Sequence, residues 1–504
     1  MTAAQTPATA GASAPRRRYD LDALRGFAML LGVGLHAALA FIPVPWWVQD
    51  RTSSFDGLYD EFLWAVHGFR MPLFFLMSGF FTALLWRRRG LRTLLEHRLR
   101  RVALPLAIGL VTLVPAVDWV GERAIATQAE ASVDQGDIFA LVFTGSVEGV
   151  EQLLDQGLDV DTRTEPGGWT PLHAAAFTGD ADMVKLLISR GAEPAPVASA
   201  SEGETPLALA FHFGHEEATD LLVAYEGQDP LPERVKWSDI PGFGAGADES
   251  GEDRLTQIEH LHHLWFLWFL LWLVAGFAVV AAFADRFGAD SGVWPKRLMW
   301  LMVPLTIVPQ LSMGRGGTYP VFGSDTSDAL LPLPHVLLYY ATFFTFGALM
   351  YGRKHRDDRL VVDTIGRPWW LILGVSFFLV LPVGLHFTFV DLQWPVASAL
   401  QVLYAWGMCF GLMGLFRVVL SGERRGVRYL SDSAYWVYLI HLPLVVAAQI
   451  MVRDLNLAAG VKFLMICVGV TAVSLLSYQA FVRYTPIGTM LNGKKARAGQ
   501  VGRR

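Results

Sequence analysis

The chain has 504 residues, of which 53% are hydrophobic and only 17% are charged, and its mean hydropathy is +0.37. Water could not cover that much apolar surface, so the composition excludes an ordinary soluble globular protein. The formal net charge of −5 hides two compositional blocks. Apolar runs of about 18 to 25 residues recur along most of the chain but are absent from residues 120–255. We therefore expect an all-α, polytopic membrane helix bundle that carries one soluble insert.

Ten apolar runs are long enough to cross a bilayer as helices, which need roughly 20 residues each. The first run follows Arg16, Arg17 and Arg18, but it is longer than the apolar core of a signal peptide and no small-residue cleavage pattern follows it. We expect about ten transmembrane helices at residues 21–42, 61–86, 102–119, 261–284, 298–313, 333–351, 368–388, 396–419, 433–452 and 460–482.

Basic residues are distributed unequally over the two sides of the predicted bundle. The segments on the side of the N-terminus hold 28 Lys and Arg residues, whereas the opposite short loops hold 4. The positive-inside rule then places both termini in the cytoplasm, which agrees with an even number of spans. We expect a multi-pass protein of a bacterial inner membrane, with a disordered N-terminus at 1–20 and a basic tail at 485–504, both cytoplasmic.

The long loop between the third and fourth predicted spans has the opposite charge. Residues 118–259 hold 28 Asp and Glu against 7 Lys and Arg. An acidic loop is compatible with the outer side of the membrane, since the basic segments define the cytoplasmic side. We therefore expect this insert to lie in the periplasm.

An internal repeat lies in this loop. The string T-P-L-H-A-A at residues 170–175 aligns with T-P-L-A-L-A at 205–210 at an offset of 35, and residues 153–157 align with 187–191 at an offset of 34. This is the ankyrin period. It predicts a helical solenoid at 136–226, with two fuller repeats after a partial one, in which Gly157 and Gly191 end the second helices.

The repeats indicate a fold more strongly than a function, because ankyrin stacks are mostly binding or spacing modules. We expect a protein partner for them. Residues 227–255 are rich in Gly, Asp and Glu and are predicted to be a linker back to the membrane.

Ionisable side chains inside predicted spans are costly and usually have a function. Arg25 and His36 in the first span are eleven residues apart, so helix geometry places them on one face about 16 Å apart. Taken alone, Arg25 is typical of an interfacial anchor, and His36 is equally typical of a structural histidine bonded to a neighbouring helix. Together they mark a face that joins the cytoplasmic edge to the middle of the membrane.

Other spans also send imidazoles toward the outer half of the bilayer. His67 and Arg70 in the second span are predicted to lie near the depth of the first span's histidine, and His441 lies mid-membrane in the ninth. His335 lies near the outer end of the sixth span. The run H-L-H-H at 260–263 lacks the spacing of zinc helices and has no acidic ligand beside it, so we expect it at the membrane interface and expect no metal site.

Five motifs resemble those of the membrane-bound acyltransferase 3 family and, within it, of the branch of periplasmic glucan succinyltransferases. They fall in residues 21–119 and 256–484, the two expected transmembrane parts of three and seven helices. The ankyrin insert departs from the family's usual plan. The motifs are L-D-A-L-R-G at 21–26 with the ten-residue spacing from Arg25 to His36, H-G-F-R-M-P-L-F-F-L-M-S-G-F-F at 67–81, H-R-L-R-R at 97–101 with Pro105, H-L-W-F-L at 263–267, and S-A-Y-W-V-Y-L-I-H-L-P at 433–443.

The resemblance implies an O-acyltransferase that moves an acetyl or succinyl group from cytoplasmic acyl-coenzyme A to a sugar or glucan hydroxyl on the periplasmic side, with no bound cofactor. We expect His36 to act as general base, because a neutral imidazole can take the proton of an attacking hydroxyl. Arg25 and Arg70 complete the expected catalytic set, with Arg70 stabilising an oxyanion or holding a succinyl carboxylate.

The phosphates of the donor need cations, which the inner loops supply, although the same arginines also fit plain topology control. Ser78 is also open to a second interpretation, as a small residue at a helix contact. The expected donor-binding residues are Arg25, Arg87, Arg88, Arg98 and Arg101, and the expected substrate-binding residues are His67, Ser78, His335 and His441. The outer loop at 314–332, with Arg315, Asp325 and Asp328, is a further candidate for contact with the acceptor.

A second hypothesis belongs to another class. A non-enzymatic transporter or partner-docking protein would use the intramembrane histidines as a proton relay and the ankyrin repeats as an interaction domain. No sequence feature separates it from the enzyme. On the first hypothesis the partners are acyl-coenzyme A, a carbohydrate acceptor, the lipid bilayer and a protein bound to the repeats, and nucleic acid is not expected.

Overall fold

The structure is a computed structural model, and it describes residues 18–42, 46–50, 57–164, 168–198, 205–213, 215–226, 261–286, 296–314, 321–327, 331–355, 357–391 and 393–492. Within these ranges the chain is helical, with one isolated β-bridge between Lys354 and Leu360 and no β-strand. Residues 1–17 of the tail expected at 1–20, residues 493–504 of the tail expected at 485–504, the whole linker at 227–255, and Arg315 and Asp328 lie outside the described residues.

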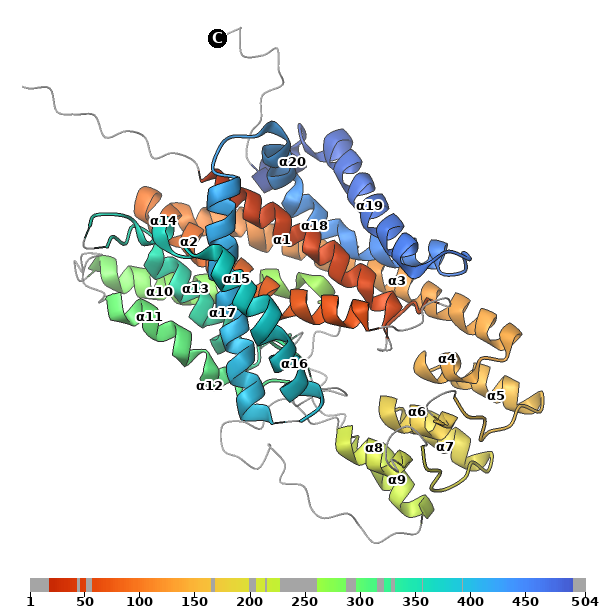
Figure 1. The fold of residues 1–504 in the computed structure, drawn as a ribbon. Coiled ribbons are helices and arrows are strands. Elements are labelled where there is room, and N and C mark those ends of the chain that lie inside the picture. The colour runs from red at the N-terminus through yellow and green to blue at the C-terminus, as the bar shows by residue number, and fades with distance from the viewer. Residues whose placement is uncertain are drawn as a thin grey trace, which may run out of the picture.

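The helices follow one another along the chain as Figure 1 shows. They are α1 (Tyr19–Ala38), η1 (Leu39–Phe41), α2 (Leu58–Arg98), η2 (Leu99–Ala103), α3 (Leu104–Gln135), α4 (Ile138–Phe143), α5 (Val147–Asp155), α6 (Pro171–Thr178), α7 (Ala181–Ser189), α8 (Pro206–Phe213), α9 (Glu216–Glu226), η4 (His262–Leu264), α10 (Trp265–Arg286), α11 (Lys296–Leu305), α12 (Ile307–Gln310), α13 (Pro334–Met350), α14 (Val361–Thr364), α15 (Trp369–Val375), η5 (Ser376–Val380), α16 (Leu381–Phe389), α17 (Trp394–Val419), α18 (Arg425–Val452), α19 (Ala459–Ser477), η6 (Tyr478–Val482) and α20 (Pro486–Asn492).

Seven helical stretches of the described chain are long and apolar enough to cross a membrane, so the protein is a multi-pass membrane protein. One of them, Leu58–Gln135, covers the second and third predicted spans, and the backbone bends inside it at Gly90, where φ is 78°. The predicted spans at 298–313 and 333–351 coincide with α11 and α12 and with α13, which are shorter. The expected all-α membrane bundle is confirmed.

Helix α1 lies inside the bundle, in contact with α2, α17, α18 and α19 (Figure 1). In its most apolar window 67% of the residues are buried, against 22% in α19, which therefore lies at the periphery. A helix surrounded by protein rather than by lipid can carry polar side chains, because neighbouring helices supply partners for them.

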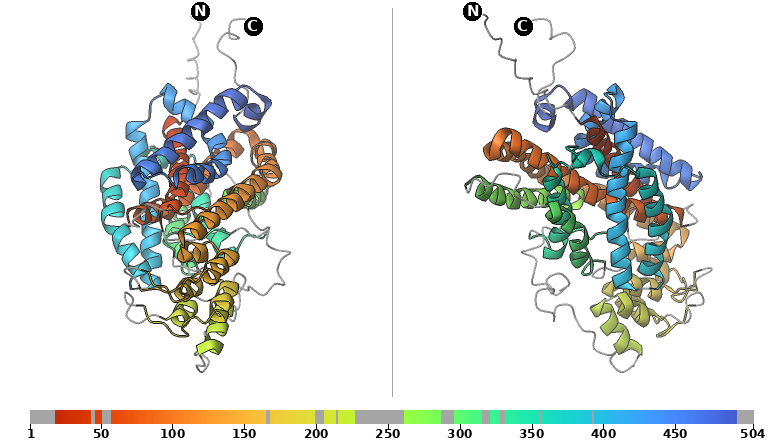
Figure 2. Two further views of the ribbon diagram at one scale, coloured as in Figure 1. Left: turned by 90° about the vertical axis from the view of Figure 1, so that its right-hand side faces the viewer. Right: turned by 60° about the vertical axis from the view of Figure 1, so that its left-hand side comes forward.

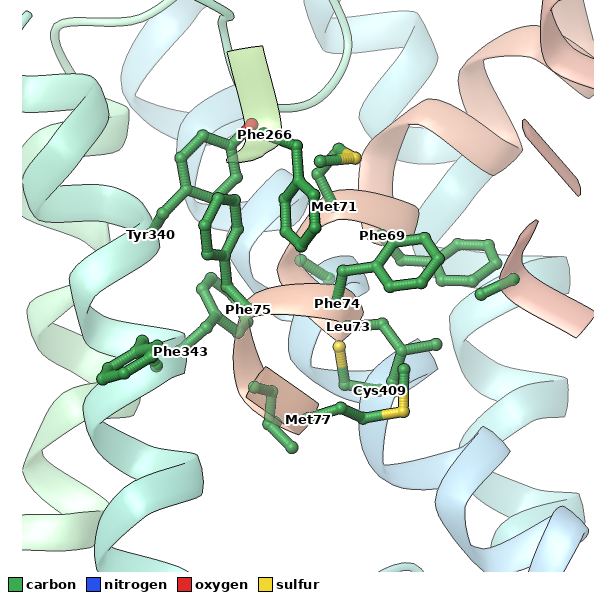
Figure 3. Close-up of a cluster of buried hydrophobic side chains, with 14 of the residues drawn as sticks. Phe69, Met71, Leu73, Phe74, Phe75, Met77, Phe266, Tyr340, Phe343 and Cys409 are labelled. Atoms are coloured by element: carbon green, nitrogen blue, oxygen red, sulfur yellow. The ribbon is translucent and has the colours of Figure 1, made fainter. Parts of the chain in front are cut away.

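Aromatic side chains fill the core between α2, α10, α13 and α17 (Figure 3). Phe75 packs its ring 4.5 Å from that of Tyr340 and 4.9 Å from that of Phe266, measured between centroids. The thiol-bearing Cys409 is buried in the same cluster. Such large rings fix the spacing of the helices that present them.

Glycines allow α2 and α13 to approach backbone to backbone. A Cβ atom added at Gly79 would lie 1.9 Å from the carbonyl oxygen of Phe344, and one added at Gly347 would lie 1.9 Å from that of Leu76. Small residues at helix crossings are a general feature of membrane bundles, because packing drives association where lipid replaces water.

Helix α3 is longer than the sequence predicted. The third span was expected to end at residue 119, but α3 continues to Gln135 and ends at Gly136, where φ is 69°. The extension has its own contacts with the bundle, since Arg453 donates to the carbonyl of Thr127 at 2.8 Å. Its last turns pack Val133 into the core of the insert. The apolar pattern fades where the helix leaves the predicted span, so hydropathy alone missed this continuation.

The insert contains three helix pairs, α4 with α5, α6 with α7 and α8 with α9, which gather at one end of the molecule (Figures 1 and 2). The first repeat was predicted to be partial, but α4 and α5 form a complete pair. Thr170 caps α6 by accepting from the backbone N–H of His173. Gly157 and Gly191 follow the second helices with φ of 93° and 83°, as the sequence predicted.

Replacing Gly347 with Ala should destabilise the bundle by about 1–3 kcal/mol, because the added methyl group collides with the backbone of α2 and no side chain can move aside. The measurement is the thermal unfolding midpoint in detergent. Gly469→Ala is the matched control, since an added Cβ there meets no atom within 4 Å. Equal midpoints for the two variants would contradict the close approach of α2 and α13.

Candidate functional site

Arg25 and His36 of α1 contact different neighbours. Near its first turns, Arg25 donates to the carbonyl and the hydroxyl of Ser431 on α18, at 3.2 and 3.3 Å. Near its other end, His36 is partly exposed and its ring lies 5.3 Å from that of His441, also on α18. The helix face predicted from the spacing of the two residues is therefore turned toward α18.

Three histidines from three elements come together at the far end of α1. The ring of His441 lies 5.3 Å from that of His36 and 5.1 Å from that of His263 on η4. His441 Nδ1 bonds to the carbonyl of Tyr438 at 2.7 Å, and His263 Nε2 bonds to that of Leu439 at 3.0 Å. Each bond fixes the orientation of one ring through one nitrogen. The second nitrogen of each ring, Nε2 of His441 and Nδ1 of His263, is not used in these bonds.

The prediction that the 260–263 run lies at the membrane interface is wrong for His263, which is 7% exposed and lies in the histidine cluster. The physical reason is the bond from the Tyr438 hydroxyl to the carbonyl of His263, at 2.7 Å, which draws η4 into the bundle. Its neighbour His262 bonds Asp118 of α3 at 2.7 Å and has an unusual positive φ of 43°. His263 belongs to the motif at 263–267, but it was not among the predicted catalytic or substrate-binding residues.

Arg70 of α2 lies near these histidines. It lies within electrostatic range of His36, His67, His263 and His441. A Cβ atom added at Gly32 would lie 2.6 Å from an Nη atom of Arg70. The guanidinium therefore rests against α1 one turn before His36, in the space that the missing side chain leaves. We name His36, His67, Arg70, His263 and His441 the polar cluster.

Each member of the polar cluster has a buried nitrogen without a hydrogen-bond partner among the described residues. Buried polar atoms are nearly always paired in folded proteins, so several unpaired ones at a single place indicate a site for a ligand or for water. No group of three His, Cys, Asp or Glu in the described chain has the arrangement of a metal site. The unpaired atoms are His36 Nδ1, His67 Nε2, Arg70 Nε, His263 Nδ1 and His441 Nε2.

Two residues predicted to bind substrate are not brought to this cluster by any described contact. Ser78 lies on α2 eight residues beyond Arg70, which is about 12 Å along a helix. His335 lies at the first turn of α13 and is partly exposed. His67 and His441, from the same predicted set, both belong to the cluster. The roles of all four residues stay predictions.

The predicted donor-binding arginines separate into two groups. Arg101 lies within electrostatic range of Arg25 and Arg89, and Arg98 lies within range of Arg101. Arg98 also donates to the hydroxyl of Thr82 at 2.5 Å and keeps a buried, unpaired Nε. By contrast, Arg87 is exposed with its guanidinium 4.6 Å from the ring of Trp86.

Arg88 and Arg89 are likewise exposed, but of these two only Arg89 lies within electrostatic range of Arg101 among the described interactions. We name Arg25, Arg89, Arg98 and Arg101 the basic cluster. Arg89 was not among the predicted donor-binding residues. Like-charged side chains held together in this way favour an anionic ligand between them.

The segments expected in the cytoplasm meet at the basic end of α1. Arg18 pairs with Asp363 at 2.6 Å, which joins the start of α1 to α14. The Tyr435 hydroxyl donates to the carbonyl of Arg101 at 2.7 Å, which joins α18 to η2. These contacts bring described parts of the basic segments together at this end of α1, and the side of the membrane that they face stays a prediction.

The loop at 321–327 supports the polar cluster from the α13 side. A Cβ atom added at Gly323, where φ is 124°, would lie 2.8 Å from the ring of His67. Asp325 is turned into the fold, where both carboxylate oxygens accept from the backbone N–H of Gly314 at 3.0 Å. Its predicted contact with the acceptor would therefore compete with a bond that holds the loop.

Comparisons with known proteins agree with this geometry. A family model described as an acyltransferase domain matches residues 18–134 and 222–479, and another, described as ankyrin repeats in three copies, matches residues 138–233. The first match covers more than half of the chain. The chain therefore belongs to this acyltransferase family and is a membrane-embedded member of it with an ankyrin insert.

Curated relatives share a shorter stretch. The chain is 38% identical over 100 residues to glucans biosynthesis protein C of Salmonella paratyphi B (strain ATCC BAA-1250 / SPB7) and, equally, to that of Salmonella heidelberg (strain SL476). The aligned stretch is 19% of this chain and 25% of each relative. The chain thus spans a quarter of the length of these bacterial relatives.

Partial burial in the 321–327 loop raises the pKa of Asp325 from 3.8 to about 6. A raised carboxyl pKa means that the folded state keeps its proton to a higher pH than the unfolded state, so stability should fall as pH rises from about 4 to about 6. The loss should reach roughly 2–3 kcal/mol at most. Asp325→Asn should remove it, and unfolding midpoints of both proteins between pH 4 and 7 are the measurement. Parallel curves would contradict the burial of this carboxyl group.

Proposed function

We propose that the protein is an integral membrane O-acyltransferase that moves an acetyl or succinyl group from acyl-coenzyme A to a hydroxyl of a sugar or glucan on the periplasmic side. The observation that carries the proposal is the polar cluster, with five unpaired nitrogens from α1, α2, η4 and α18. Membership of the acyltransferase family supports the reaction class. The printed name of the Salmonella relatives, which refers to glucans, supports the class of acceptor.

His36 is the proposed general base. Its Nδ1 atom is unpaired, and no described carboxylate bonds to the ring, so a neutral imidazole is free to accept a proton. In the proposed step the acceptor hydroxyl oxygen attacks the thioester carbonyl carbon while His36 takes its proton. The C–O bond forms, the C–S bond breaks, and the coenzyme A thiolate leaves and takes the proton back from the imidazolium.

Arg70 is placed to stabilise the charge that develops on the carbonyl oxygen. A fixed cation with an unpaired N–H can donate to an oxyanion without reorganising at the moment of reaction. Its position against Gly32, one helical turn before His36, puts donor and base on neighbouring elements. A succinyl carboxylate is a second anion that Arg70 could hold.

The basic cluster is the proposed site for the phosphates of the donor. Arg25, Arg98 and Arg101 gather at the end of α1 that the positive-inside rule assigns to the cytoplasm. α1 therefore connects a site for an anionic donor on one side with a base toward the other side. Acyl-coenzyme A would lie along this helix, with its thioester near the polar cluster, in a bacterial inner membrane.

The test is acyl transfer by the purified protein in detergent, with radiolabelled acetyl- and succinyl-coenzyme A and a glucan acceptor. His36→Ala should lower the rate by about 100-fold or more, because removing a general base typically costs that much. His386→Ala is the matched control, since that histidine is exposed on α16 and pairs with Asp391. It should keep the rate of the unaltered chain.

One result would contradict the role of His36, and another would contradict acyl transfer by this protein. Transfer that survives in the His36→Ala protein would remove the catalytic role of this residue. No transfer with either donor by well-folded protein would favour the transporter hypothesis, in which the same histidines relay protons.

The ankyrin insert is proposed to be accessory to the chemistry and to bind a protein partner. Deleting residues 138–226 while keeping α3 through Gln135 should leave acyl transfer to a soluble glucan close to that of the full chain, because the polar cluster contains no residue of the insert. A deletion that begins at residue 120 is the contrasting variant. It also removes the bond between Thr127 and Arg453 and should lower activity. Equal loss of transfer in both deletions would show that the insert itself is required.

A further inference from the structure

Residues 46–50, which we name the strap, are fixed to four surrounding helices. Trp46 Nε1 donates to Gln449 Oε1 of α18 at 2.9 Å, and the backbone N–H of Gln49 donates to Gln128 Oε1 of α3 at 2.9 Å. Asp50 bonds the carbonyl of Ala40, just beyond α1, through its backbone N–H at 2.8 Å. Five residues without regular structure are thus held by hydrogen bonds at both ends.

The end of the strap is anchored by a buried ion pair. Lys462 of α19 donates to the carboxylate of Asp50 at 2.8 Å, and their side chains are 0% and 2% exposed. Lys462 also donates to the carbonyl of Arg453 at 2.8 Å. Burying two charges is costly unless each is fully bonded, so such a pair selects one arrangement of the chain over others.

The strap places an indole on the proposed base. The rings of Trp46 and His36 are stacked, with centroids 6.0 Å apart and planes 20° apart. Trp47 packs on Trp46 at 4.7 Å, and its own Nε1 lies against α3 at Gly121, where an added Cβ would be 3.0 Å away. The imidazole is therefore confined by an aromatic side chain that is itself packed in place.

Gln449 joins this indole to the backbone of the base. Its Nε2 donates to the carbonyl of His36 at 2.9 Å and more weakly to that of Ala37 at 3.4 Å, while its Oε1 accepts from Trp46. The last carbonyls of a helix lack partners within the helix, so this amide fixes the end of α1. One buried side chain thus holds both the main chain of His36 and the ring that stacks on it.

We infer that Trp46 and Gln449 are positioning residues for His36, with the strap as the device that holds the imidazole at the polar cluster. The inference rests on the proposed function, because it assigns His36 the role of base. A base misplaced by about 1 Å can lose a large part of the rate. Contacts that confine the imidazole ring would therefore raise the rate of transfer. Neither residue touches the reacting atoms, so each acts through His36.

The experiment compares Trp46→Phe, Trp46→Ala and Gln449→Leu in the full chain in detergent. Trp436→Phe is the matched control, because it also removes an indole N–H bond within the bundle, the 2.9 Å bond to Ser477 Oγ, but away from His36. The first readout needs no activity: the rate at which diethyl pyrocarbonate modifies His36, followed by peptide mass spectrometry. Trp46→Ala and Gln449→Leu should speed it several-fold, Trp46→Phe less, and Trp436→Phe not at all.

The second readout is steady-state transfer. Gln449→Leu and Trp46→Ala should lower kcat by roughly tenfold while KM for the acyl donor stays nearly constant, and they should shift the acidic limb of the pH profile of kcat/KM. Trp46→Phe, which keeps a stacked ring, should recover much of the loss. A merely structural role would lower the amount of folded protein without moving the pH profile.

Unchanged modification of His36 in the Trp46→Ala and Gln449→Leu proteins would overturn the inference, as would losses of transfer equal to those of Trp436→Phe. An inactive unaltered chain would instead contradict the proposed function. The modification rates would still decide whether the strap positions His36.

Discussion

The guanidinium of Arg70 is held inside the helix bundle, and its charge restricts which side chains can lie next to it. A cation at that depth needs polar neighbours, and four histidines from separate elements surround it. Its place exists because Gly32 has no side chain on the facing side of α1. Gly32 lies one turn before His36, so the guanidinium occupies this space beside the proposed base.

Helix α1 contributes His36 to the polar cluster and Arg25 to the basic cluster, so it connects the two. It is the most enclosed of the long helices, and it contacts four others. Burial of α1 therefore keeps Arg25 and His36 away from lipid, while their neighbours differ: Arg25 donates to Ser431, and the ring of His36 lies beside that of His441. One helix thus sets the separation between the basic cluster and the polar cluster.

Helix α3 connects the insert to the membrane part without a flexible joint. It bonds His262 through Asp118 near its middle and the strap through Gln128, and its end packs into the first ankyrin repeat. The repeats are joined to one another by exposed ion pairs such as Arg190 with Glu151, which contribute little stability each but link adjacent helix pairs. The insert is consequently oriented relative to the polar cluster by continuous helix rather than by a tether on this side.

The sequence by itself determined the class of fold, the place of the insert and most of the polar cluster. Apolar runs and the 34-residue period are local patterns, and the spacing of Arg25 and His36 fixes a helix face wherever the helix lies. Only the tertiary structure decided that His263 enters the cluster, that Arg89 lies within electrostatic range of Arg101, and that Trp46 stacks on His36. These facts depend on hydrogen bonds and glycine contacts between segments far apart in the chain, such as those of Gln449 and Gly32. No local pattern of residues encodes such contacts, since each needs two distant backbones to be already in place.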